Sequence, residues 1–386
     1  MNNSPRLWRT LIPAICCTLL CSLLTGCFES SVKIGVALPL SGASTPRGQE
    51  ILNGVLMAVE DVNHYGGIHG HQVELLIEDD QDSPAQGRKA AEALIHKHVL
   101  GVVGHYSSDV TLEVLPIYIQ AKTALVSPSV TLSRIPSEGS IFFRTLGSNE
   151  QQAQAAVKFI HASGFSRIAI VRNDSLYGRD LSERLQASLK AYSGIRRMLL
   201  EDGPDCLERL RRQLPELVFY AGGYQDAAQF LQRLRESGQQ PAFMGGNTLR
   251  DSEFIRLAGL GQVKEVWITD SGLPPDTFLT RYRQRFGQPG PFSAFAYDAA
   301  RLLLSAAEQA KSLEPESVRA ELAQRKLYQG LTGAILLNPH ARDISQSKIG
   351  ILTVTPDGRF LPAQAIRPLF IPAGQRAGNW ARQALK

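Results

Sequence analysis

The chain has 386 residues, with 41 basic and 36 acidic side chains and a formal net charge of +5. Two of the basic residues, Arg6 and Arg9, precede Cys27, so the segment after Cys27 carries 39 basic against 36 acidic residues. This near balance is too weak a positive charge to indicate nucleic-acid binding. The 359 residues after Cys27 are enough for two α/β lobes of ordinary domain size.

The first 26 residues have the pattern of a bacterial lipoprotein export signal. Arg6 and Arg9 precede an uncharged apolar run that begins at Leu11 and closes on Leu24-Thr25-Gly26-Cys27. The run is shorter than the roughly 20 residues of a membrane-spanning helix, and small residues precede the cysteine, as a signal peptidase requires. We therefore expect cleavage before Cys27 and attachment through a lipid on its thiol. An uncleaved anchor is the alternative.

A lipid on Cys27 would hold the mature chain at the bacterial cell envelope, facing the periplasm or the exterior. Position 28 is Phe rather than Asp, so retention on the inner membrane is not indicated and either membrane fits. Three of the five cysteines lie within the signal segment. Cys206 is then the one thiol left, which we interpret as inert, and a disulfide framework is excluded.

Short β-branched runs alternate with amphipathic, helix-length segments along the rest of the chain. Residues 33–39 (KIGVALP) are typical of a strand, and apolar residues then recur at helical spacing as far as Tyr65. Strict alternation predicts α/β lobes with doubly wound parallel sheets. Ligands of such sheets bind beyond the carboxyl ends of the strands. The further predicted strands are 72–78, 100–104, 124–127, 168–172, 218–221, 242–244 and 266–269, and predicted helices include 88–96, 181–192 and 226–237.

Hydroxyl groups follow two of these strands. Ser107 and Ser108 lie at the start of a helical segment, where hydroxyls and free backbone N–H groups together suit a carboxylate. Ser129 and Thr131 follow the strand at 124–127. Helix capping and an ordinary turn are the structural alternatives for these four residues.

Tyrosines beside glycines follow two later strands. Tyr177 precedes Gly178, and Tyr224 follows a pair of glycines. Tyrosine can line a binding cleft with a flat apolar surface and a polar tip. Ordinary packing in the core explains both side chains equally well.

The other clusters of reactive residues do not predict a catalytic or metal centre. His64, His69 and His71 crowd a glycine-rich turn without a cysteine or carboxylate at a familiar metal-ligand spacing. Residues 78–82 (EDDQD) lack the loop pattern of an EF-hand. The sequence contains no G-x-S-x-G, P-loop or H-E-x-x-H motif. We therefore expect neither an enzyme nor a bound metal or cofactor.

Ten short motifs occur in the same order as in a known family. They are KIGVALPLSG (33–42), AVEDVNHYGGIHG (58–70), ELLIEDDQDSP (74–84), GHYSS (104–108), SPSVT (127–131), RIAIVRNDSLYG (167–178), VFYAGGY (218–224), FMGG (243–246), AYDAARLL (296–303) and GLTG (330–333). With them, residues 32–360 resemble the periplasmic branched-chain amino-acid (Leu/Ile/Val) binding proteins.

The resemblance implies a type I periplasmic binding protein fold, in which two lobes joined by three chain crossings close on a ligand like a Venus flytrap. We expect a mobile, basic tail after the second lobe, with contact to an anionic surface as the alternative. The expected crossings are 145–148, 270–273 and 326–330; lobe 1 comprises 31–145 with 273–327, lobe 2 comprises 146–270 with 330–362, and the tail is 363–386.

The resemblance also implies roles for individual residues. Ser108 and Thr131 match the positions that hold the ligand's α-carboxylate in this family, with help from the backbone at Ser129. Tyr177 and Tyr224 match the tyrosines that line the cleft. All five positions keep side chains suited to these roles.

Two positions of the expected ligand site depart from the family pattern. Asn247 takes the place of the acidic residue that pairs with the ligand's α-ammonium in this family, and Arg47 takes the place of a tyrosine. Losing a charge-assisted bond to a buried ammonium costs about 1.5 to 3 kcal/mol. We therefore expect a ligand without an α-ammonium, an acid or an amide. Asp226 and Asp251 are the nearby acids that could compensate for the missing carboxylate, although we expect both at helix starts on the surface. A solvated surface position is the alternative for Arg47.

Two functions fit these features. The first is a lipid-anchored solute-binding protein that captures a small amino-acid-like, amide or organic-acid ligand and delivers it to an ABC permease. The second keeps the fold and the site but makes the output regulatory, as a ligand sensor or an envelope lipoprotein that contacts another protein. The intact set of polar side chains at the expected site favours ligand capture.

Overall fold

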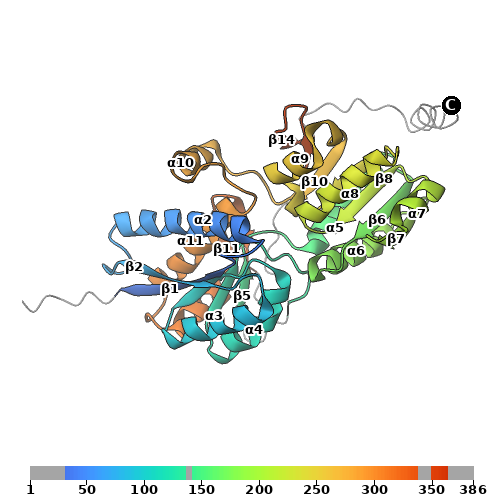
Figure 1. Ribbon diagram of the computed structural model, residues 1–386. Helices are drawn as coiled ribbons and strands as arrows, with labels where there is room; N and C mark the ends of the chain where they lie inside the picture. Colours follow the sequence, from blue (N-terminus) through green and yellow to red (C-terminus); the bar gives the residue numbers. More distant parts are fainter. Residues whose placement is uncertain (1–30, 136–140, 338–348, 364–386) are drawn as a thin grey trace, which may run out of the picture.

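The computed structural model describes residues 31–135, 141–337 and 349–363. The predicted signal segment with Cys27 and residues 364–386 of the predicted tail lie outside these ranges. Within them, no helix combines the length and the apolar character needed to cross a bilayer. Figure 1 shows the chain folded into two lobes, each a sheet covered by helices.

Lobe 1 is built on a five-stranded parallel sheet in the order β2-β1-β3-β4-β5. Helices α2, α11 and α12 pack on one face, and α3 and α4 pack on the other. Because both faces are covered, the strands are nearly continuous apolar runs. The strands are β1 (Val32–Leu38), β2 (Val73–Asp79), β3 (Gly101–Gly104), β4 (Ala124–Ser127) and β5 (Phe142–Arg144), and the helices are α2 (Thr45–His64), α3 (Pro84–His96), α4 (Ser108–Gln120), α10 (Asp276–Phe286), α11 (Ser293–Gln309) and α12 (Pro315–Gln324).

Lobe 2 is built on a seven-stranded sheet in the order β14-β13-β10-β9-β8-β6-β7. Strands β13 and β14 join it antiparallel at one edge, and the other five strands are parallel. Helices α5 and α6 cover one face, and α7, α8 and α9 the other. The strands are β6 (Arg167–Arg172), β7 (Arg196–Glu201), β8 (Leu217–Ala221), β9 (Ala242–Gly245), β10 (Val266–Asp270), β13 (Gly350–Val354) and β14 (Phe360–Pro362), and the helices are α5 (Asn149–Ala162), α6 (Leu176–Leu189), α7 (Cys206–Gln213), η1 (Asn247–Leu249), α8 (Tyr224–Glu236), α9 (Ser252–Ala258) and η2 (Leu260–Gln262).

Two helices of lobe 2 begin earlier than the sequence pattern predicts. Helix α6 begins at Leu176, because the Ser175 hydroxyl accepts a hydrogen bond from the backbone N–H of Gly178 at 3.0 Å and so caps the helix. Helix α8 begins at Tyr224. Tyr177 and Tyr224 therefore lie on the first turns of helices and not in the preceding loops.

One of the three expected crossings is wrong. The chain passes from β5 to α5 through residues 145–148, and it leaves lobe 2 after Asp270, the last residue of β10. We expected the return to lobe 2 at 326–330. Instead β11 (Leu327–Gly330) and β12 (Gly333–Leu336) form a hairpin, and Ile335 and Leu337 are buried in the core of lobe 1. Burial of these two apolar side chains keeps the chain in lobe 1 through Leu337.

The two sheets share one strand order in their parallel parts, β2-β1-β3-β4-β5 and β7-β6-β8-β9-β10. In each sheet, the first strand lies between the second and the third, so the connections that leave the first and third strands run in opposite directions. Ligands of doubly wound sheets bind between these two strands, at their carboxyl ends. Arg47 and Ser108 follow the two diverging strands of lobe 1, and Tyr177 and Tyr224 follow those of lobe 2.

Candidate ligand-binding site

Lobe 1 contributes three buried hydroxyl-bearing residues. The exposed fractions of Ser108, Ser129 and Thr131 are 6%, 8% and 2%. Ser107, not Ser108, caps helix α4, because its hydroxyl accepts from the N–H of Val110. The capping alternative therefore applies to Ser107 and leaves Ser108 at the first position of the helix.

The two loops that bear these hydroxyls are bonded to each other. The Ser129 hydroxyl donates to the carbonyl oxygen of Tyr106 at 2.8 Å, which joins the loop after β4 to the loop after β3. The Thr131 carbonyl accepts from the N–H of Asn149 at 2.6 Å. The Ser129 hydroxyl is therefore engaged by the protein itself.

His105 fixes the loop that leads to Ser108. Its Nδ1 lies 2.7 Å from Asp80 Oδ2 and its Nε2 lies 3.1 Å from the Tyr118 hydroxyl, and all three side chains are buried. The His105 carbonyl accepts from the Ser127 hydroxyl at 3.2 Å. We did not single out His105 from the sequence, where only its place in the GHYSS motif marks it.

Lobe 2 brings together two of the predicted site residues. The Tyr177 hydroxyl donates to Asn247 Oδ1 at 3.3 Å. The backbone N–H of Asn247 donates to Gln152 Oε1 at 2.9 Å, and that oxygen also accepts from the Thr269 hydroxyl at 2.8 Å. Burial raises the pKa of the Tyr177 phenol well above its usual value, so the hydroxyl stays neutral. A Cβ on Gly246 would collide with this hydroxyl, so a larger residue there would force the Tyr177 side chain to move.

Arg47 joins the two lobes. It lies in the first turn of α2, only 6% exposed, and its Nη1 is 2.7 Å from Glu50 Oε2. Its Nη2 is 2.7 Å from Asp251 Oδ2 in lobe 2, and its guanidinium carbon lies 5.0 Å from the centre of the Tyr224 ring. The alternative of a solvated surface arginine is therefore wrong.

Asp251 also differs from its expected surface position. Its side chain caps α9 by accepting from the Glu253 N–H at 2.8 Å, as expected for a helix start, yet it is only 3% exposed. Asp226 is exposed, as expected, and accepts from Asn173 Nδ2 at 2.7 Å. The surface position expected for Asp251 is therefore wrong, and lobe 2 places a buried carboxylate beside Arg47.

The charges of this cluster are strongly perturbed. Burial raises the pKa of Glu50 from 4.5 to about 7 and raises the pKa of Asp251, although Arg47 opposes both shifts. Burial disfavours the Arg47 charge, but Glu50 and Asp251 outweigh it and raise the pKa of the guanidinium. Arg47 is thus always charged, while Glu50 titrates near neutral pH.

Arg250 forms a second bridge, between lobe 2 and the segment before α11. Its Nε lies 2.6 Å from Asp270 Oδ2 at the end of β10, and its Nη2 donates to the carbonyl oxygen of Pro291. Burial raises the pKa of Asp270, and Arg250 opposes the shift. Sequence reasoning missed this pair, because the two side chains become neighbours only when β10 lies next to η1.

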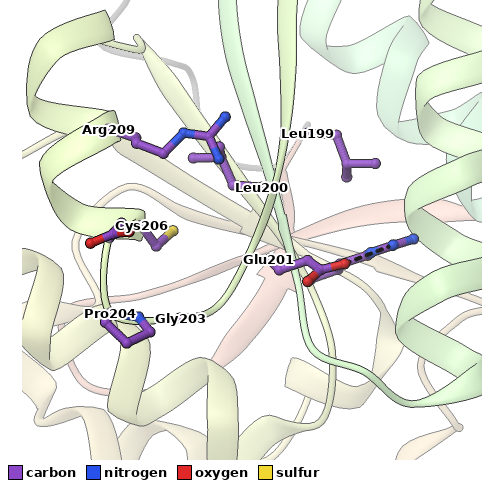
Figure 2. A pocket seen from close by; sticks show the side chains of 9 residues that line it. Leu199, Leu200, Glu201, Gly203, Pro204, Cys206 and Arg209 are labelled. Atoms are coloured by element: carbon purple, nitrogen blue, oxygen red, sulfur yellow. Dashed lines mark hydrogen bonds and ion pairs between the residues drawn. The ribbon is translucent and has the colours of Figure 1, made fainter.

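A separate hollow of about 370 Å³ lies at the ends of β6 and β7 (Figure 2). Arg172 and Glu201, which form an ion pair with 3.2 Å between nitrogen and oxygen, belong to its lining. Cys206 lines it but is only 3% exposed, and burial raises its thiol pKa to about 11, which agrees with an inert thiol. None of the predicted ligand residues lines this hollow. Among the described residues, no group of three or more His, Cys, Asp or Glu side chains is placed to hold a metal ion.

Comparison with known proteins gives a consistent picture. The family model described as "Periplasmic binding protein" matches residues 31–349. The "Leu/Ile/Val-binding protein homolog 1" of Brucella abortus (strain 2308) is 25% identical over 319 residues, which cover 79% of this chain and 85% of the relative. An "Amino acid binding protein" of Pseudomonas aeruginosa is 28% identical over 302 residues, or 74% and 80% of the two chains.

Solved structures share the fold. The crystal structure of the branched-chain amino acid transporter substrate binding protein LivJ from Streptococcus pneumoniae, in complex with isoleucine, superposes with a TM-score of 0.78 at 22% identity. The match covers 86% of this chain and 98% of that one. At this level of identity the likeness establishes the type I architecture with two lobes, which the strand order above already indicates.

Proposed function

Because the chain belongs to the periplasmic binding protein family, we propose that it is an extracytoplasmic solute-binding protein that captures a small carboxylate or amide ligand between its lobes. The observation that carries the proposal is the placement of buried and half-buried polar side chains at the carboxyl ends of both sheets. Ser108 and Thr131 lie on lobe 1, and the bonded pair of Tyr177 and Asn247 lies on lobe 2. Capture of this kind requires no catalytic group.

A carboxyl or amide oxygen of the ligand is the group best suited to the hydroxyls of lobe 1. Ser108 begins helix α4, where free backbone N–H groups and the helix dipole favour negative charge. The names of the relatives support an amino-acid-like ligand in general, and the replacement of an acid by Asn247 supports an acid or an amide in particular.

We further propose that a lipid on Cys27 holds the protein at the cell envelope and that it delivers its ligand to an ABC permease. The relatives support the transport role, since LivJ is named as the substrate-binding protein of a branched-chain amino acid transporter. Delivery predicts that deletion of the gene abolishes uptake of the ligand, whereas a purely sensory protein would leave uptake intact and change a transcriptional response.

The direct test is a thermal-shift screen of the purified protein against amino acids, their amides and small organic acids, since a ligand that binds the native state raises its melting temperature. Ser108→Ala and Thr131→Ala are then titrated by calorimetry. Each hydrogen bond to a charged oxygen contributes about 1.5 to 3 kcal/mol, so each variant should bind roughly 10 to 100-fold more weakly. Ser193→Ala, at an exposed position, is the matched control. Unchanged affinity in both site variants would refute the proposal.

A further inference from the structure

The positive charge of Arg47 lies between a carboxylate and an aromatic ring of the other lobe. It reaches from α2 of lobe 1 to Asp251 of lobe 2 at 2.7 Å, and its guanidinium lies over the ring of Tyr224. A carboxylate and an aromatic face are the two groups that together attract an ammonium group. In this chain both are already engaged by a side chain of the protein itself.

Lobe 1 holds Arg47 in this position. Glu50, one turn further along α2, binds Nη1 at 2.7 Å and is itself fixed by the N–H of Phe292, which donates to its Oε1 at 2.9 Å. The Tyr282 hydroxyl donates to the Glu50 carbonyl at 3.1 Å. Contacts within its own lobe therefore orient the arginine.

One donor of this arginine has no partner. Among the described residues, the Nε–H of Arg47 is buried and lacks an acceptor. A buried donor without an acceptor costs about 1 to 3 kcal/mol, and a ligand oxygen would remove that cost. Arg47 therefore has its Nη1 hydrogen-bonded to Glu50 and its Nη2 in an ion pair with Asp251, whose buried Oδ2 makes no hydrogen bond among the described residues. One N–H of the guanidinium is left for an acceptor.

We propose that Arg47 is a tethered counter-ion: it neutralises the charge of Asp251 and covers the ring of Tyr224 across the lobes in place of a ligand cation, so that the site selects acids and amides that lack an α-ammonium. This inference rests on the proposed function and deepens it. The site does contain a carboxylate, but Arg47 neutralises it. A ligand with an ammonium group has to displace the guanidinium from Asp251 or lie unpaired beside a like charge, and both cost free energy.

The inference predicts a preference that one substitution reverses. Leucine and 4-methylpentanoate share their carboxylate and branched chain and differ in the α-ammonium. The unmodified protein should bind 4-methylpentanoate at least about tenfold more tightly than leucine, as measured by calorimetry. Arg47→Met keeps an apolar stem and frees Asp251, so it should shift the ratio of the two affinities roughly tenfold or more towards leucine. An unchanged ratio would overturn the inference.

A second measurement uses no ligand. Because Arg47 links the lobes, Arg47→Met and Asp251→Asn should each increase the radius of gyration of the ligand-free protein in small-angle scattering, and the double variant should add nothing further. Arg281→Met is the matched control, because Arg281 pairs with Asp61 within lobe 1. Equal radii in all variants would overturn the inference. If neither probe bound to any variant, the proposed carboxylate-binding function would fail, and the scattering result would still decide the role of Arg47.

Discussion

Gly290 lies so close to the Glu50 carboxylate that a single added methyl group tests the geometry of the cluster. A Cβ at this position would fall within the space of the carboxylate oxygens. In Gly290→Ala the carboxylate therefore has to move, and it loses the 2.9 Å bond from the Phe292 N–H and its contact with Arg47. Neither loss can be made good by water, because Glu50 is only 6% exposed.

The expected loss follows from these contacts. A hydrogen bond to a charged group contributes about 1.5 to 3 kcal/mol, and overpacking a buried site costs about 1 to 3 kcal/mol. We expect Gly290→Ala to lower the free energy of unfolding by at least about 2 kcal/mol, and the melting temperature by roughly 5 °C for a lobe of this size. Gly261→Ala is the control, because nothing lies within 4 Å of its added Cβ.

Urea unfolding of Gly290→Ala, with and without Glu50→Ala, provides the assay. Once the Glu50 side chain is removed, the added methyl group has nothing to displace, so most of its cost should disappear in that background. If Gly290→Ala cost the same free energy of unfolding in both backgrounds, the clash with Glu50 would not be its cause and our account of the cluster would be wrong.

Three further predictions concern stability and processing. Burial raises the pKa of Glu50 from 4.5 to about 7, so the contribution of this group to stability is complete below pH 4.5 and is lost as the pH rises through 7. Relative to Glu50→Gln, the unmodified protein should lose up to about 3 kcal/mol of unfolding free energy between these limits in urea titrations. Parallel pH profiles of the two proteins would contradict this. The Asp298 carboxylate accepts hydrogen bonds of 2.7, 2.8 and 2.6 Å from Leu331 and Thr332. Asp298→Ala should therefore lower the free energy of unfolding by about 2 to 4 kcal/mol in the same assay. An unchanged midpoint would show that other contacts hold the hairpin of β11 and β12. Cys27→Ala should yield unprocessed or soluble protein by fractionation, and the lipid prediction fails if mass spectrometry finds an unlipidated mature N-terminus on the unmodified protein.

The alternation of buried strands and amphipathic helices made the two sheets predictable from local sequence. Strands such as β1 and β8 are buried on both faces and show it as continuous apolar runs. The rule that ligands bind at the carboxyl ends of parallel strands then indicated the loops near Ser108 and Tyr177. Strand β7 was not among the predicted strands, because it is an edge strand that begins with the exposed Arg196 and Arg197 and so lacks a continuous apolar run.

Only the tertiary structure decided which charges are buried together. Asp251 has the local pattern of a surface helix cap, and Arg47 that of an exposed arginine on a first helical turn. Neither residue's neighbours in the sequence reveal that the two lie 2.7 Å apart. The same holds for the hairpin of β11 and β12, whose place in lobe 1 depends on Ile335 packing in a distant core. Burial and pairing across lobes depend on how the two sheets face each other, and local periodicity carries no information about that arrangement.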